Sequence, residues 1–147
     1  MRSSMVLLTL LAGISVAAYG SKRESLEQLI ARAPSARAQD QPHLYIEIAS
    51  KELEAAEKSY KTGENDAARK SVDELVSYSG KASDAASQTG KKLKDTEIAL
   101  RKMAQKLRDL KRGLPFEDQA PVQAAADRLE QMRTDLLSRM FGKKGKS

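Results

Sequence analysis

The stretch VDELVSYSGKASDAASQTGKKLKDTEIALRKMAQKLRDL, residues 72–110, decides the fold. Apolar or small residues recur in it at alternating intervals of three and four, which is the spacing of a heptad seam. The seam positions are Val72, Leu75, Ser79, Ala82, Ala86, Thr89, Leu93, Thr96, Leu100, Met103, Leu107 and Leu110. Because the register never slips, the pattern favours one continuous helix over about 66–112, about 70 Å long.

The middle of this stretch also offers an alternative. Gly80 and Gly90 each cost roughly 1 kcal/mol inside a helix, and several serines nearby weaken it further. A break near residues 87–90 would divide the stretch into two helices and give a four-helix up-down-up-down bundle. The unbroken register favours the long helix over this alternative.

Shorter helical patterns flank the long one. Pro42 can open a helix that runs to Lys61, and Gly63 suits the left-handed cap that ends it. Gly113 and Pro115 end the central stretch, a loop follows over 116–120, and a last helix runs over 121–141. We therefore expect an all-α domain over 42–141, an elongated antiparallel bundle of three helices.

This arrangement predicts a thin molecule. The helix over 43–61 would fold back on 66–86, and the helix over 121–141 would fold back on 92–112. Each half would be two helices thick and would bury little apolar surface. Thinness of this kind motivates the hypothesis that two chains associate into a thicker bundle.

The N-terminus has the pattern of an export signal. Arg2 precedes an apolar run from Met5 to Ala18, which is short for a membrane span but typical of a signal peptide over 1–20. The chain has no Cys, which excludes lipoprotein anchoring and suits a bacterial periplasm or secretion. The alternative is a membrane anchor through uncleaved residues 5–18. Residues 21–41 then read as a flexible spacer or pro-segment.

Basic charge is concentrated in one block. Residues 91–112 hold nine basic and three acidic residues, and 142–147 form a basic tail that we expect to be disordered. The block either faces an anionic partner or is a solvated helix face beside the acidic last helix. No aromatic residue interleaves it, which argues against nucleic acid. The possible interaction surface comprises Lys91, Lys92, Lys94, Arg101, Lys102, Lys106 and Arg108.

The sequence offers no convincing catalytic, cofactor or metal site. Zero Cys excludes thiolate chemistry, and His43 is the one histidine. His43 and Glu47 are one helical turn apart and could touch a metal ion, but two ligands do not make a site. No Gly-rich phosphate loop follows a strand, and nothing points to a small-molecule substrate.

These patterns predict an exported, non-enzymatic helical protein of the cell envelope. It would act by binding a protein partner or a second copy of itself. The alternative is a protein of the membrane surface, which would bind anionic lipid through its basic segments.

Overall fold

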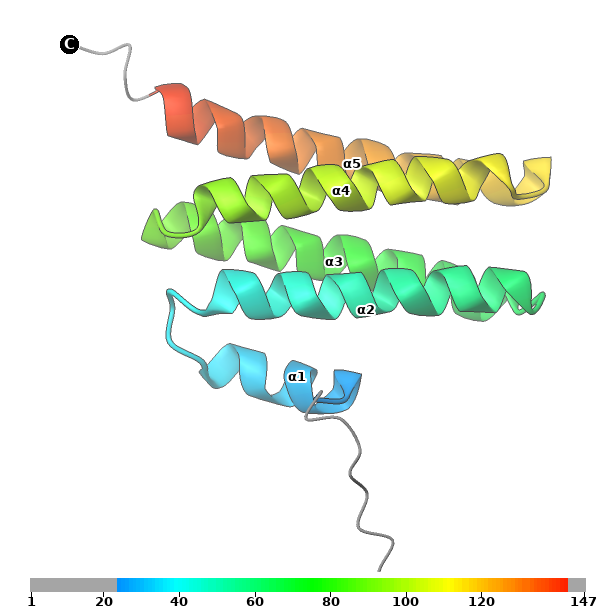
Figure 1. Ribbon diagram of the computed structural model, residues 1–147, viewed down its shortest axis with the longest axis horizontal. Helices are drawn as coiled ribbons and strands as arrows, with labels where there is room; N and C mark the ends of the chain where they lie inside the picture. Colours follow the sequence, from blue (N-terminus) through cyan, green and yellow to red (C-terminus); the bar gives the residue numbers. More distant parts are fainter. Residues whose placement is uncertain (1–23, 143–147) are drawn as a thin grey trace, which may run out of the picture.

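The computed structural model describes residues 24–142, and this part of the chain is all-helical (Figure 1). Its helices are α1 (Leu26–Arg32), the short 3-10 helix η1 (Ala33–Ser35), α2 (Gln41–Lys61), α3 (Asn65–Thr89), α4 (Leu93–Arg112) and α5 (Phe116–Gly142). The predicted signal peptide over 1–20, the alternative anchor over 5–18 and tail residues 143–147 lie outside the described residues.

The continuous helix expected over 66–112 is wrong. Helix α3 ends at Thr89 and α4 begins at Leu93. Between them Gly90 has φ 66° and Lys92 has φ 63°, and both values lie in the left-handed region that turns a chain out of a helix. The heptad pattern cannot reveal this break, because Thr89 and Leu93 stand four positions apart and keep the seam in register.

The four long helices form two antiparallel hairpins that lie side by side. Helices α2 and α3 make one hairpin, and α4 and α5 make the other (Figure 1). Helix α4 lies beside α2, and α5 lies beside α3. Helices α2 and α5 occupy opposite corners and have no Cα pair within 8 Å. The neighbours across the hairpins therefore run parallel to each other.

One apolar core joins the two hairpins. It takes buried residues from all four long helices, among them Leu53, Leu75, Leu100 and Leu129. The expected separate halves, each two helices thick, are therefore wrong. The break at residues 90–92 lets the second hairpin pack against the first, which supplies the burial that thin halves would lack.

Part of the expected spacer is folded. Residues 26–35 form α1 and η1, and the flexible spacer predicted for 21–41 is to this extent wrong. Ser25 begins α1 with a capping box to Gln28. Leu29, with 1% of its surface exposed, packs with Leu44 and Ile48 in a second apolar cluster. Apolar burial on α2 thus holds a helix that its short length alone would not maintain.

Helix α5 begins earlier than expected. The loop predicted over 116–120 is the start of α5, and Pro121 lies inside the helix. Pro121 is the sixth residue of α5, so it leaves the Glu117 carbonyl without the hydrogen bond that a backbone N–H at position 121 would donate. The buried Asp118 carboxylate holds this first part of α5 to α3, because it accepts hydrogen bonds from Asn65 Nδ2 and Arg69 NH2, both at 3.1 Å.

Candidate interaction surfaces

The seven basic residues predicted as an interaction surface divide between different faces. Lys91 and Lys92 lie in the α3–α4 loop, and the other five lie along α4. Successive residues of a helix turn by about 100°. Arg101 and Arg108 therefore share the edge of α4 that faces α5, whereas Lys102 lies on the outer face of the helix. Six of the seven are exposed, and Arg108 is half-buried.

The edge of α4 that faces α5 is closed by ion pairs. The Glu97 carboxylate, 6% exposed, accepts a hydrogen bond from Arg133 Nε at 2.6 Å. Glu130 pairs with Arg108 at 3.0 Å and with Arg133 at 3.2 Å. Arg101 lies 4.0 Å from the same Glu97 oxygen. The basic stretch and the acidic last helix thus meet at this edge.

The pKa values at this edge follow from the pairing. Burial alone would raise the pKa of Glu130, but hydrogen bonds from Arg108 and Arg133 outweigh it and lower that pKa. Hydrogen bonds to Glu97 and then to Glu130 raise the pKa of Arg133. Each charge is balanced by a neighbour within the fold. Arg108 therefore contributes less to an external surface than the sequence suggested.

The outer face of α4 is different. Lys102 and Lys106 are exposed there, and neither forms an ion pair with another residue of the described part of the chain. Lys94 is also exposed and without an ion pair in this part, but it stands seven residues before Arg101 and therefore lies on the edge that faces α5. Asp95 and Asp109 share this face and reduce its net charge. The structure thus separates the free lysines on the outer face from Arg108, which pairs with Glu130 of α5, and from Arg101, which lies near Glu97 of α4 itself.

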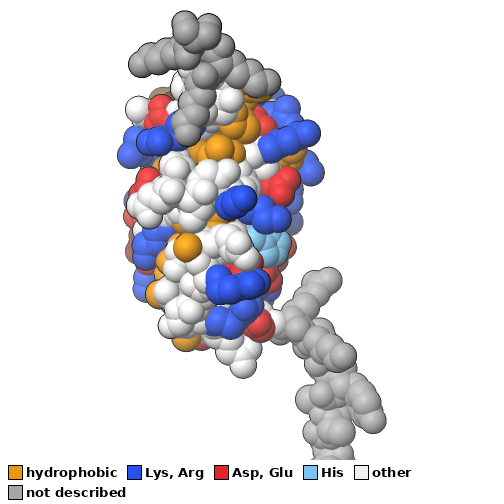
Figure 2. Space-filling model, turned by 90° about the vertical axis from the view of Figure 1, so that its left-hand side faces the viewer, with side chains coloured by type: hydrophobic (Ala, Val, Ile, Leu, Met, Phe, Trp, Pro, Cys, Tyr) orange, Lys and Arg blue, Asp and Glu red, His pale blue; other side chains and the backbone are white. Residues whose placement is uncertain are grey.

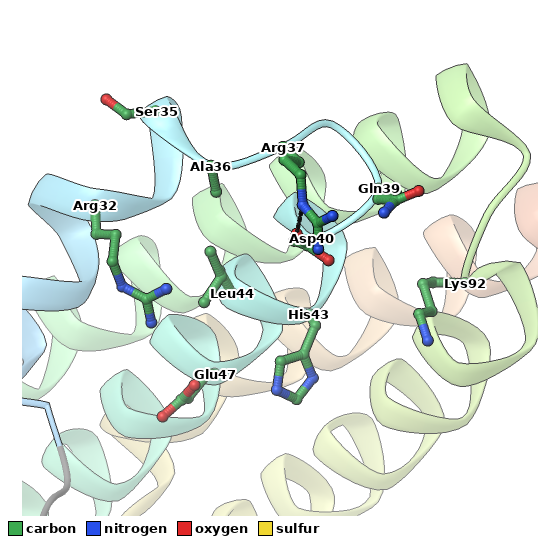
Figure 3. A pocket seen from close by; sticks show the side chains of 10 residues that line it. All are labelled: Arg32, Ser35, Ala36, Arg37, Gln39, Asp40, His43, Leu44, Glu47 and Lys92. Atoms are coloured by element: carbon green, nitrogen blue, oxygen red, sulfur yellow. Dashed lines mark hydrogen bonds and ion pairs between the residues drawn. The ribbon is translucent and has the colours of Figure 1, made fainter.

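A groove of about 770 Å³ lies between the α1–α2 connection and the α3–α4 loop (Figure 3). Its lining residues are Arg32, Ser35, Ala36, Arg37, Gln39, Asp40, His43, Leu44, Glu47 and Lys92. The arginines already have carboxylate partners, because Arg32 pairs with Glu24 and Arg37 with Asp40, both at 2.7 Å. The groove therefore carries mixed charge and no concentration of one sign.

The structure brings no further metal ligand to the His43 and Glu47 pair. Both side chains line the groove, and His43 is exposed (Figure 3). Among residues 24–142 there is no group of three or more His, Cys, Asp or Glu side chains that could hold a metal ion.

Glu52 is a buried acid that sequence reasoning missed. It lies with Ser71, Glu74 and Tyr78 in a hollow that Ile30 of α1 also lines, and only 7% of it is exposed. Burial raises its pKa; Ser71 opposes the rise by hydrogen bonding, and the Glu74 carboxylate adds to it. Glu52 lies in a run of alternating Glu and Lys residues that reads as solvated surface, so no local signal distinguishes it.

Exposed aromatic residues at both ends of α5 were also missed. Phe116 begins the helix and is 85% exposed, and Phe141 near its end is 64% exposed. Leu137 and Met140 beside Phe141 are half-buried. The sequence predicts a helix over this stretch, but only the packing shows which of its apolar residues the core leaves uncovered.

Comparison with known proteins adds no relative: no protein-family model, no curated protein and no solved structure matches this chain. No helix within residues 24–142 has the length and apolar character needed to cross a membrane.

Proposed function

We propose that this chain is an exported, non-enzymatic helical protein of the cell envelope that works by binding an acidic protein partner. The observation that carries the proposal is the outer face of α4, where Lys102 and Lys106 are exposed and unpaired within the described residues, whereas Asp109 on the same face is paired with Arg112 at 3.2 Å. Lysines without a partner in the fold attract a partner of the opposite sign and speed its association. The export part rests on the apolar run over 5–18.

Within this proposal, the four long helices act as one bundle and not as two flexible halves. The shared core through Leu75 and Leu100 supports this view. It also removes the reason for self-association that a thin molecule would have had. A second copy of the chain remains the other partner considered, and its binding would have to use an exposed surface.

Charge reversal on α4 tests the proposal. The variant Lys102→Glu with Lys106→Glu changes two exposed side chains, and Lys58→Glu with Lys61→Glu on α2 makes the same charge change elsewhere. We expect cross-linking in host envelopes to recover a specific acidic protein with the native chain and the α2 variant. The α4 variant should lose it, and salt should weaken the complex.

Two results would contradict the proposal. One is recovery of the same partner with all three chains, which would place the contact elsewhere. The other is recovery of no specific partner together with a monomeric mass in sedimentation. A partner that proves to be a second copy would replace the acidic protein with self-association.

A further inference from the structure

Helix α5 ends in an apolar cluster that the core leaves partly uncovered. Leu136 faces the core and is fully buried, whereas Leu137 and Met140 are half-buried. Phe141 is 64% exposed in the last turn of the helix. Burying an aromatic ring is strongly favourable, so an exposed phenylalanine beside two half-exposed apolar residues marks a surface that can gain by being covered.

Basic residues surround this cluster because α4 and α5 run antiparallel. Arg133 of α5 lies opposite Glu97 of α4. One turn further along α5 is Leu137, and one turn back along α4 is Leu93, with Lys94 next to it. Phe141 lies another turn beyond, at the end of the molecule where the α3–α4 loop carries Lys91 and Lys92 (Figure 1).

The view onto this end shows the same mixture. Hydrophobic side chains gather toward the top of this face, and Lys and Arg side chains lie on both sides of them (Figure 2). Lys91, Lys92 and Lys94 are exposed, and none forms an ion pair with another residue of 24–142. Asp95 and Asp135 are the exposed acids nearby, so the basic charge exceeds the acidic charge.

We propose that this end of the molecule is a lipid-contact tip, which touches an anionic bilayer with Phe141 and the lysines of the α3–α4 loop. An aromatic ring that enters the boundary between headgroups and acyl chains supplies apolar burial. Each lysine near the surface adds attraction to anionic headgroups. The two contributions add, because the strength of interfacial binding depends on the buried apolar area and on the attraction to anionic lipid.

The composition of the tip favours lipid over protein. The centres of protein interfaces are enriched in aromatic residues, Met and Arg and depleted in lysine. Phe141 and Met140 would suit either kind of contact, but the three exposed lysines Lys91, Lys92 and Lys94 beside them favour an anionic bilayer. The tip goes beyond the proposed protein partner, because it uses the end of α5 and the α3–α4 loop, whereas the partner is assigned to Lys102 and Lys106.

The test uses the chain purified from its host, with whichever N-terminus it carries there, and two kinds of vesicle. One contains phosphatidylglycerol and phosphatidylcholine, and the other contains phosphatidylcholine alone. Phe141→Ala should weaken sedimentation with anionic vesicles about tenfold. Phe116→Ala is the matched control, since Phe116 is equally aromatic, more exposed and at the opposite end of α5. It should leave binding unchanged.

A charge series tests the lysines. Replacing Lys91, Lys92 and Lys94 by Gln should weaken binding by about fivefold per lysine at low salt, and added salt should reduce the difference. Replacing Lys58, Lys102 and Lys106 by Gln is the control with the same loss of charge. The proposal would be overturned if the first triple variant bound anionic vesicles with unchanged affinity. An equal loss of affinity in both triple variants would also overturn it.

The chain contains no Trp, so a single introduced Trp reports its own surroundings. The emission of Phe141→Trp should shift to shorter wavelength with anionic vesicles, and that of Phe116→Trp should not. Equal behaviour of the two variants would overturn the proposal, as would cross-links from position 141 only to a protein. A protein contact at Lys102 and Lys106 could fail while this result stands, so the two proposals are separable.

Discussion

Two substitutions in the loop between α3 and α4 should change stability in opposite directions. Left-handed backbone costs a residue other than glycine roughly 1–2 kcal/mol. Glycine costs about 0.5–1 kcal/mol through the entropy of the unfolded chain. Lys92 has φ 63° and Gly90 has φ 66°. Lys92→Gly should therefore raise the free energy of unfolding by about 0.5–1 kcal/mol, and Gly90→Ala should lower it by about as much.

The structure makes this a backbone effect. A Cβ added at Gly90 has no heavy atom within 4 Å, so no clash contributes. Lys92 is exposed, so its side chain contributes little packing. In an unbroken helix both signs would reverse, because glycine is about 1 kcal/mol less favourable than alanine in a helix interior. The pair of variants therefore distinguishes two hairpins from one long central helix.

Urea unfolding followed by far-ultraviolet circular dichroism measures both changes in the free energy of unfolding. The comparison requires that this free energy depends on urea concentration with the same slope in each variant. Gly63→Ala is a control for which a loss of stability is expected. Gly63 has φ 77°, which is unfavourable for alanine, and an added Cβ would meet no heavy atom within 4 Å. Gly80→Ala should raise stability, because Gly80 lies within α3 and its added Cβ would lie 3.6 Å from the Met132 Cε atom. A fall with Lys92→Gly together with a rise with Gly90→Ala would refute the broken helix.

Three other substitutions test buried features. Glu52→Gln should raise the free energy of unfolding at neutral pH, because the raised pKa of Glu52 means that ionisation costs stability in the folded state. The difference should shrink as the pH falls through that pKa and should disappear below the ordinary glutamate pKa of 4.5. Urea unfolding from acid to neutral pH measures it, and a difference that stays constant would contradict the reasoning. Ser79→Ala should raise stability by about 0.5–1 kcal/mol, since the buried Ser79 hydroxyl has no hydrogen-bond partner; a loss in the same assay would reveal a partner. Leu29→Ala should speed hydrogen exchange in α1 and leave α4 and α5 protected, whereas uniform loss of protection would show that α1 does not open separately.

The sequence predicted the buried seams well, because a seam depends only on local spacing. Val72, Leu75 and Leu100 were expected on the apolar seam and lie in the core. The spacing does not say which helix each seam meets. The sequence offered a break near residues 87–90 only as the less favoured alternative, since the seam stays in register across it and Lys92 is not a residue type that signals left-handed backbone.

The candidate surface could be predicted as a block of charge but not resolved into its parts. Whether Arg108 is free or paired depends on Glu130, which is far away in sequence and adjacent only when α5 packs on α4. Glu52 and Phe141 illustrate the same limit. Neighbouring helices decide how exposed these two side chains are. The alternating charges around Glu52 therefore give no sign that it is buried, and the apolar stripe of α5 gives no sign that the Phe141 ring is exposed.

The order of the hairpins has a consequence for how such a chain could change over generations. Because the second hairpin lies beside the first in the same orientation, a duplicated hairpin placed after α5 could stack on α4 and α5 without disturbing the earlier pair. At the other edge α1 already covers α2 and would have to be displaced. Growth by duplication is therefore easier at the edge formed by α4 and α5 than at the edge where α1 covers α2. Each added hairpin would lengthen the row of helices and the surface along it.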